Sequence, residues 1–357
     1  MMTPDLFTLF LLGMICVPIS WAVPSKYAFD AISIWTFMCL LLLSPASALW
    51  LLAIAILLPC ALTFGGRAKG PVTAIASLAL IAGLVASRTL PGWAWIGGAF
   101  FTLRALHVVL EWWMGRISTL GYRESLHYFL FLPVLPAGPI NRLPHFQHQL
   151  RRRRWEPEQF LTGAERVLIG LVWLYLIAGK GVAKIDFEVM LATETLAPFW
   201  RIWAGSAVSW VELFFVFAGA THVALGVSLM MGLKLEENFS KPWAARNLVE
   251  FWTRWHMSLT GWVQDYVFRP ITALTRQPVI ALIAALLVIG LWHEFSLYYI
   301  LWALWQSLGI VLSRFMLPQR AGISLPNWIS AVAGPICVLG WLSAARPVIG
   351  LILGGFP

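Results

Sequence analysis

Long apolar runs without charged residues recur along the whole chain and predict its architecture. A bilayer crossing takes about 20 predominantly apolar residues, and many of the runs approach that length. We therefore expect roughly eight to ten crossings with some re-entrant pieces, and no polar stretch is long enough for a soluble domain. The first run has Asp5 in place of a basic signal-peptide region, so a retained first helix is expected. The runs lie near residues 5–23, 31–43, 46–64, 71–87, 93–103, 161–178, 202–233, 278–292, 297–313 and 325–345.

The apolar stretch at 278–312 contains the most informative residue. It is too long for one crossing and fits two that meet near Glu294, with His293 at the break. An ionisable group at membrane depth costs roughly 2.5–3.5 kcal/mol or more, so it faces protein or a water-filled cavity. His293 is therefore a candidate for proton transfer inside the bilayer. We expect burial to keep its imidazole neutral.

A second polar segment follows residue 246. Asn247 with Glu250 three residues later predicts a capped helix that begins at about 248. Glu250 and Arg254 are spaced for an ion pair at i, i+4, as are Asp265 and Arg269.

This predicted helix carries a histidine among tryptophans. Trp252, His256 and Leu259 are expected to share one helical face, with Trp255 beside it. The helix is too polar and short for a lipid-facing span, so it should pack inside the protein or lie in the interface.

Two earlier segments also combine polar and apolar residues. Arg104, His107 and Glu111 are spaced i, i+3, i+7 on one helical face, which suits either a polar interior or a helix end that snorkels to the interface. Three prolines and a glycine at 133–139 preclude a regular spanning helix. We expect a short span that breaks into a re-entrant or interfacial turn.

Composition and charge agree with a membrane protein. Of 357 residues, 60% are apolar and 11% are charged, against about 25% charged in soluble domains. The 21 tryptophans suit interfacial belts and aromatic cavity walls. The net charge of +9 comes from basic loops such as 151–154, which is typical of cytoplasmic loops and not of nucleic-acid binding. The four cysteines have no Cys-x-x-Cys spacing, so neither a disulfide nor a zinc site is expected.

The remaining histidines favour structural roles. His107, His127 and His222 lie on apolar helices, where hydrogen bonding to backbone is the usual role. His145 and His148 are spaced i, i+3, but no nearby Cys or acidic residue completes a metal site. No Ser-His-Asp order or phosphate-cradling glycine loop is present. If the protein is an enzyme, a histidine must act as base on a substrate hydroxyl.

Several blocks resemble the membrane-bound O-acyltransferase family. They are most similar to its bacterial branch of alginate O-acetyltransferases and the D-alanyl transfer protein of teichoic acid synthesis. The chain differs from that branch at 220–222, where Tyr-Ser-Asp is typical, at Glu294 and at Gln264. The resemblance covers roughly 97–312, with blocks at 100–104, 136–140, 217–226, 235–242, 250–259, 265–266 and 291–302.

The resemblance implies an all-α polytopic membrane protein, with a ring of tilted transmembrane helices around a thin, funnel-like centre and with re-entrant and interfacial helices. It implies one integral membrane domain with N-terminal helices at 1–96, a catalytic core at 97–317 and a C-terminal helix at 318–357. His293 is expected as catalytic base and His256 as its catalytic partner, with His256 or Asn141 as oxyanion donor. Supporting or substrate-binding residues are expected at Asn141, Arg104, Trp252, Trp255, Asn238, Asp265, Trp292, Glu294 and Tyr298.

The implied activity is acyl transfer, with acetyl favoured, from a cytoplasmic donor to a hydroxyl of an extracytoplasmic envelope polysaccharide. The donor would be acetyl-CoA or an acyl-carrier thioester, with no bound cofactor or metal. The implied location is the bacterial cytoplasmic membrane, crossed many times. Transfer could be direct or relayed by a periplasmic esterase-like partner. Arg151 to Arg154 could dock an acidic carrier protein or anchor the chain to anionic lipid. D-alanyl transfer to a teichoic-acid-like polymer is the alternative, and a transporter or proton channel is the alternative of another class.

Overall fold

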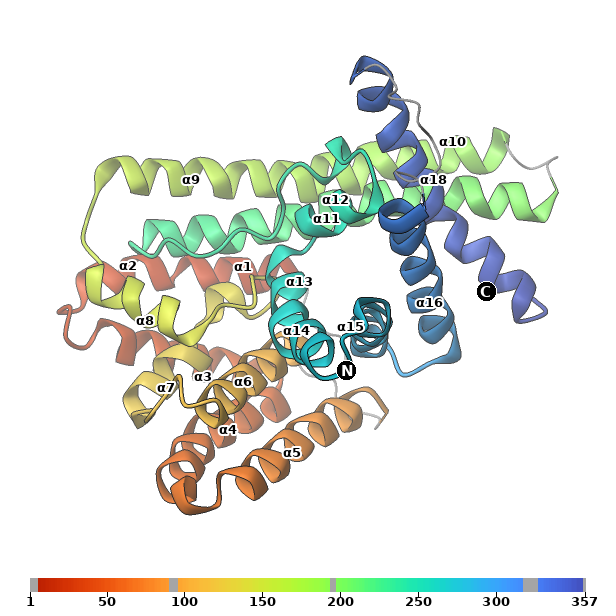
Figure 1. Cartoon of the computed structure of the whole chain (residues 1–357). Coiled ribbons are helices and arrows are strands. Elements are labelled where there is room, and N and C mark those ends of the chain that lie inside the picture. The colour runs from red at the N-terminus through yellow and green to blue at the C-terminus, as the bar shows by residue number, and fades with distance from the viewer. Residues whose placement is uncertain (1–5, 90–95, 193–196, 317–326, 356–357) are drawn as a thin grey trace. The chain divides into compact units, whose positions relative to one another are not determined.

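The computed structural model describes residues 6–89, 96–192, 197–316 and 327–355 (Figure 1). Within these residues the chain is helix, turn or loop and none of it forms a β-strand, which confirms the expected all-helical fold. The predicted features at Asp5 and at the 317/318 boundary lie outside the described residues. The helices form two compact units, Met1–Leu171 with Ala220–Glu236, and Val172–Gly219 with Glu237–Pro357. The division at 96 and 317 stays a prediction.

Unit 1 contains the N-terminal helices and the end of α11. Helices α9 and α11 pack closely within it because a Cβ on Gly163 would lie 2.7 Å from the carbonyl oxygen of Gly226. Its elements are α1 (Leu6–Met14), α2 (Cys16–Ala22), α3 (Ala28–Leu43), α4 (Pro45–Phe64), η1 (Gly65–Ala68), α5 (Lys69–Thr89), α6 (Gly98–Trp113), α7 (Tyr122–Phe129), η2 (Leu132–Val134), α8 (Leu143–Arg152), α9 (Pro157–Leu171) and the last turns of α11 (Pro198–Met230).

The proline-rich segment of unit 1 is broken backbone, as expected. After α7 and the short η2 it runs as a buried loop to the start of α8. Buried side chains hold this loop: Tyr128 Oη donates to the carbonyl of Asn141, and Thr221 Oγ1 donates to the carbonyl of Ala137 at 3.1 Å. These bonds satisfy the loop carbonyls that a helix would otherwise pair.

Unit 2 contains the first part of α11 and everything after residue 236. Two successive helices, α15 and α16, form a hairpin that turns at Glu294 to Ser296, which confirms the predicted break. The elements are η3 (Val172–Val182), α10 (Ala183–Ala192), α11, η4 (Pro242–Ala244), α12 (Leu248–Arg254), α13 (Met257–Val263), η5 (Gln264–Phe268), α14 (Arg269–Thr275), α15 (Pro278–His293), α16 (Leu297–Val311), η6 (Leu312–Met316) and α18 (Asn327–Ile352).

The α15–α16 hairpin depends on Gly290. A Cβ at this position would lie 2.6 Å from the carbonyl oxygen of Tyr299, so the two backbones touch where the hairpin closes. We expect Gly290→Val to force the helices apart and to destabilise the protein by about 1–3 kcal/mol, as overpacking does. Thermal unfolding in detergent measures this, with Gly261→Ala as the control because a Cβ there meets open space. Equal melting temperatures for the two variants would contradict the close packing.

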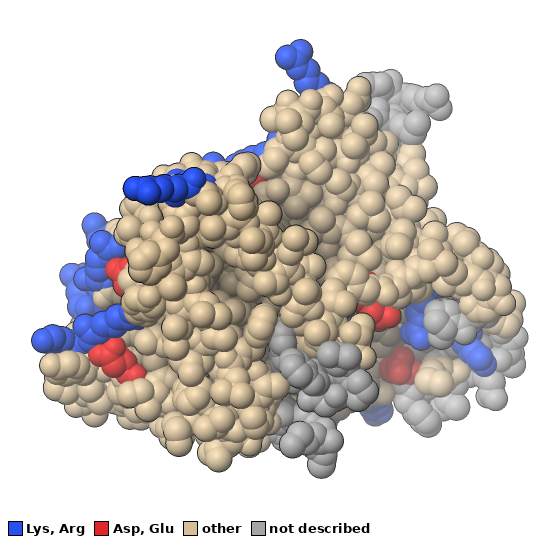
Figure 2. Space-filling view, turned by 90° about the horizontal axis from the view of Figure 1, so that it is seen from below, with Lys and Arg blue, Asp and Glu red and all other residues tan. Residues whose placement is uncertain are grey.

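Several helices suit a bilayer by length and composition. Within the part of the chain that the structure describes, four are long and apolar enough to cross one: Pro45–Thr89, Pro157–Asp186, Pro198–Met230 and Ala331–Ile352. Leu6–Ala22, Ala28–Leu43 and Pro278–His293 are shorter apolar helices. On the face shown in Figure 2, uncharged residues dominate and Lys and Arg side chains gather near the edges. The lengths and apolar character of these helices are consistent with a membrane protein, and the number of crossings stays a prediction.

The basic segment at the end of α8 is not one uniform patch. Arg151 and Arg152 are exposed and Arg154 pairs with Glu156. Arg153 instead lies over the Trp21 ring at 4.0 Å and donates to the carbonyl of Met231 at 2.8 Å. Arg153 therefore has a packing role within unit 1 that the exposed Arg151 and Arg152 do not share.

We expect Arg153→Gln to lower the stability of unit 1 by about 1–3 kcal/mol, because it removes a charged hydrogen bond and a cation–π contact. Replacing Arg151 and Arg152 together should leave the melting temperature unchanged.

A cysteine in place of the exposed His148 tests the sidedness of this segment. Its reaction with an impermeant thiol reagent in intact cells would contradict a cytoplasmic location.

Candidate active site around two histidines

His256 lies between two short helices of unit 2. The Asn247 side chain accepts from the Glu250 N–H at 2.9 Å, so α12 begins at Leu248 as predicted. The predicted Glu250–Arg254 ion pair is also present. Helix α12 ends at Arg254, however, and His256 has φ 44° and ψ 54° as the residue before α13. The prediction that His256 continues the face of Trp252 is therefore wrong.

The break at His256 is held by the segment before η4. The N–H of Ser240 donates to the carbonyl of Arg254 at 3.0 Å, and the N–H of Met257 donates to the carbonyl of Asn238 at 2.8 Å. The Ser258 hydroxyl also donates to Oδ1 of Asn238, a fully buried side chain, at 2.6 Å. These bonds flank His256 on both sides. They hold a left-handed backbone that costs of order 1–3 kcal/mol for a residue other than glycine.

The ring of His256 is enclosed by aromatic side chains. It is only 3% exposed and meets the Phe217 ring edge-to-face with centroids 4.7 Å apart. The indole of Trp292 lies on another side at 6.0 Å. Burial, with a smaller contribution from His293, lowers the pKa of His256 to about 3. The imidazole is therefore neutral at physiological pH.

His293 is the last residue of α15. Its ring stacks on Tyr299 with centroids 5.6 Å apart at 20° and also contacts Trp292 at 4.8 Å. The side chain is exposed, so the expectation that His293 is buried is wrong. The helix ends at this residue, and the side chain lines a cavity of unit 2.

Both histidines line one cavity of about 370 Å³ in unit 2, within the usual size range of ligand sites. Four tryptophans and two tyrosines contribute to its wall, together with apolar residues, three Ser or Thr hydroxyl groups and Arg346. The cavity is lined by Ser206, Ser209, Trp210, Leu213, Phe217, Trp252, Trp255, His256, Leu259, Thr260, Ile289, His293, Tyr298, Tyr299, Trp302, Leu342, Ala345 and Arg346.

The structure brings part of the predicted supporting set to this cavity. Trp252, Trp255 and Tyr298 line it, and Trp292 contacts both histidine rings. Asn238 holds the backbone behind His256.

The acidic candidates, Asp265 and Glu294, do not line the cavity. Asp265 accepts from Arg269 at 2.8 Å, which confirms the predicted pair, and Glu294 is exposed in the hairpin turn.

Two predicted supporting residues belong to unit 1. Arg104 is buried with its guanidinium 4.2 Å from the Tyr128 ring, so the interior alternative for this polar face holds. His107 accepts from the N–H of Leu143 at 3.1 Å, the structural role expected of it. The Asn141 amide is fully buried, and neither of its polar atoms has a hydrogen-bond partner among the described residues.

Sequence reasoning missed several cavity residues. Tyr299 and Trp302 could have been found because they are spaced i, i+3 on the helix that directly follows the break at His293. Phe217 gave no signal beyond its apolar character. Arg346 did give one, since it is a lone charge within the apolar helix α18.

This arrangement suits general base catalysis on a bound hydroxyl. His293 presents its imidazole to the cavity, while buried His256 offers a neutral group that could donate to a carbonyl oxygen. Within the described residues, no three His, Cys, Asp or Glu side chains are grouped as metal ligands would be.

Comparison with known proteins identifies the family of this chain. Residues 103–344 match the model of the membrane-bound O-acyltransferase family, MBOAT. The chain is 29% identical over 225 residues to the probable alginate O-acetylase AlgI of Pseudomonas aeruginosa, which covers 61% of the chain and 42% of that protein. It is 30% identical over 234 residues to the teichoic acid D-alanyltransferase of Streptococcus thermophilus, covering 61% and 56%. It is 29% identical over 206 residues to the peptidoglycan O-acetyltransferase of Helicobacter pylori, covering 53% and 38%. The chain thus matches only about two fifths to just over half of the length of these relatives.

Proposed function

Because the chain belongs to the membrane-bound O-acyltransferase family, we propose that it transfers an acetyl group from a cytoplasmic thioester to a hydroxyl of an envelope polysaccharide. The observation that carries the proposal is the shared cavity, which His293 faces and His256 borders. The names of the alginate and peptidoglycan relatives support an acetyl group and a polysaccharide acceptor. The donor would be acetyl-CoA or an acyl-carrier thioester.

In the proposed mechanism, His293 takes the proton of the substrate hydroxyl as its oxygen attacks the thioester carbonyl carbon. A new C–O bond forms, and the carbonyl oxygen gains negative charge that His256 is placed to stabilise by donating a hydrogen bond. The C–S bond then breaks, and the thiolate that leaves takes the proton from His293. The aromatic walls limit water in the cavity, which protects the thioester from hydrolysis.

The proposal includes a setting for this chemistry. We place the chain in the bacterial cytoplasmic membrane, crossing it many times, with a ring of tilted helices around a thin, funnel-like centre. Such a thin centre would let a donor made in the cytoplasm meet an acceptor outside. A periplasmic esterase-like protein could complete transfer to the polymer, and a carrier protein could deliver the donor.

D-alanyl transfer is the second candidate, favoured by the similarity to a teichoic acid D-alanyltransferase. Cells that lack the gene and cells complemented with it distinguish the two. Mass spectrometry of base-released acyl groups from purified envelope polymers should show acetate only in complemented cells. D-alanine in its place would select the alternative, and no change in either group would contradict acyl transfer.

A further inference from the structure

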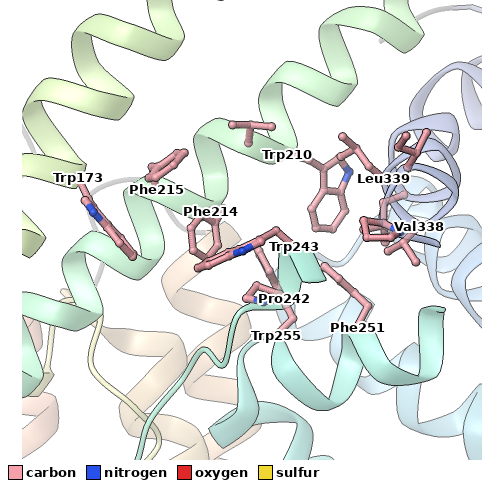
Figure 3. Close-up of a pocket in the computed structure, with 14 residues that line it drawn as sticks. Trp173, Trp210, Phe214, Phe215, Pro242, Trp243, Phe251, Trp255, Val338 and Leu339 are labelled. Atoms are coloured by element: carbon pink, nitrogen blue, oxygen red, sulfur yellow. The ribbon is translucent and has the colours of Figure 1, made fainter. Parts of the chain in front are cut away.

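A larger cavity adjoins the histidine cavity in unit 2. It has a volume of about 580 Å³ and lies between α11, α18 and the segment of η4 (Figure 3). The two cavities share Trp210, Trp255 and Leu342 as wall residues. A third hollow of about 660 Å³ continues along α11 and α18, sharing Ile336 and Leu339 with the large cavity. The three cavities are therefore neighbours in unit 2, and each shares wall residues with the next.

The wall of the large cavity is aromatic and well packed. The ring of Phe214 contacts Trp243 edge-to-face at 5.0 Å and Trp173 at 5.7 Å, and Phe251 stacks on Trp255 at 5.4 Å (Figure 3). Interlocking rings of this kind give a defined shape. Every lining side chain of this cavity is aromatic, aliphatic or proline, so its complement is a hydrocarbon.

The histidine cavity has a different character. Arg346 is the one lining residue of that cavity with a permanent charge, and Tyr298 lines the same cavity. A guanidinium pairs most strongly with a phosphate or carboxylate, through two parallel hydrogen bonds. Arg346 also lies beyond the residues that match the family model.

We propose that one substrate is an anionic amphiphile, whose phosphate binds Arg346 and whose hydrocarbon chain occupies the large cavity. An acetyl or alanyl group is too small to fill about 580 Å³, so the chain belongs to the acceptor, a saccharide carried on a lipid phosphate. This inference rests on the proposed function for the hydroxyl that His293 deprotonates, and it names the substrate class of the same site. A bilayer solvates a chain as well as a cavity does, so selectivity must come from Arg346 and from shape.

The test is photolabelling of the full chain in lipid nanodiscs with a diazirine-bearing dodecyl phosphate. We expect labelled peptides from α11 and α18, with dodecyl phosphate competing at a concentration at least tenfold lower than dodecanol. Inorganic phosphate, coenzyme A and palmitoyl-CoA should compete weakly. Competition by palmitoyl-CoA as strong as by dodecyl phosphate would assign the chain to the donor and overturn the acceptor assignment.

Two variants with matched controls complete the test. Arg346→Gln should abolish the preference for dodecyl phosphate over dodecanol, whereas Arg201→Gln, an exposed arginine on α11, should keep it. Val211→Trp should cut labelling at least fivefold by filling the cavity. Val172→Trp should not, since Val172 is similarly exposed (43% against 37%) but lines none of the three cavities.

If neither Arg346→Gln nor Val211→Trp changes the labelling, the probe reports ordinary membrane lipid around the protein, and the inference is overturned. Binding is measured separately from turnover, and labelling of His293→Ala should equal that of the wild type. If the wild-type protein transfers acyl groups but shows no preference for dodecyl phosphate over dodecanol, the lipid substrate alone is rejected. Intact selectivity without any transfer would reject the proposed function and keep the lipid site.

Discussion

His293→Ala should lower acylation of the envelope polymer by at least 100-fold, the lower end of what a general base contributes (about 10²–10⁴-fold). The imidazole ends α15 and faces the cavity, so its removal takes away the base without disturbing a packed helix. The measurement is acyl release from polymer of complemented cells, normalised to the amount of protein in the membrane. Retention of more than about a tenth of the rate would exclude His293 as the base.

The matched control is His148→Ala, which removes an exposed histidine from unit 1. It should leave both membrane protein and acylation unchanged. His293→Gln is a useful companion because glutamine keeps a polar side chain that can contact Tyr299 but cannot accept a proton at neutral pH. A loss as large as that of the alanine variant would show that a polar contact with Tyr299 does not replace a group that accepts a proton. Activity restored by glutamine would leave only a positioning role for His293.

The parts of this site that could be predicted from sequence have local causes. The helix break at Glu294, the cap at Asn247 and the pair Asp265–Arg269 all depend on residues within four positions of each other. Such short-range interactions form whatever the rest of the fold is, so the local sequence is enough to predict them. The blocks around the two histidines also identified the family before the cavity was known.

The parts that could not be predicted depend on contacts between distant segments. The left-handed backbone of His256 is imposed by Asn238 and Ser240, which hydrogen-bond across the break. Arg153 looks like its neighbours in sequence, yet the Trp21 ring fixes it in place. Arg346 reaches the histidine cavity only because α18 packs beside α16 within unit 2. Pattern along one helix carries no information on these pairings.

His256 should prove supporting, and three substitutions separate its ring from its backbone. Asparagine tolerates the left-handed conformation and can still donate a hydrogen bond, so we expect His256→Asn to lower acylation about tenfold, less than the 10²–10³ lost with a whole oxyanion donor. His256→Leu should lose about 100-fold or more, since leucine cannot donate and is strained at φ 44°.

His256→Gly is the decisive control for His256. Glycine relieves the strain at this position and keeps the bonds from Asn238 and Ser240 to the flanking backbone, but it empties the space between Phe217 and Trp292. If the ring stabilises a carbonyl oxygen, the glycine variant should be as inactive as leucine while its melting temperature stays nearer that of the wild type. Activity close to wild type in His256→Gly would reduce His256 to a backbone role. Complete and equal loss in the asparagine and leucine variants, with normal expression, would instead assign it a direct part in proton transfer, because only the imidazole can accept and return a proton there.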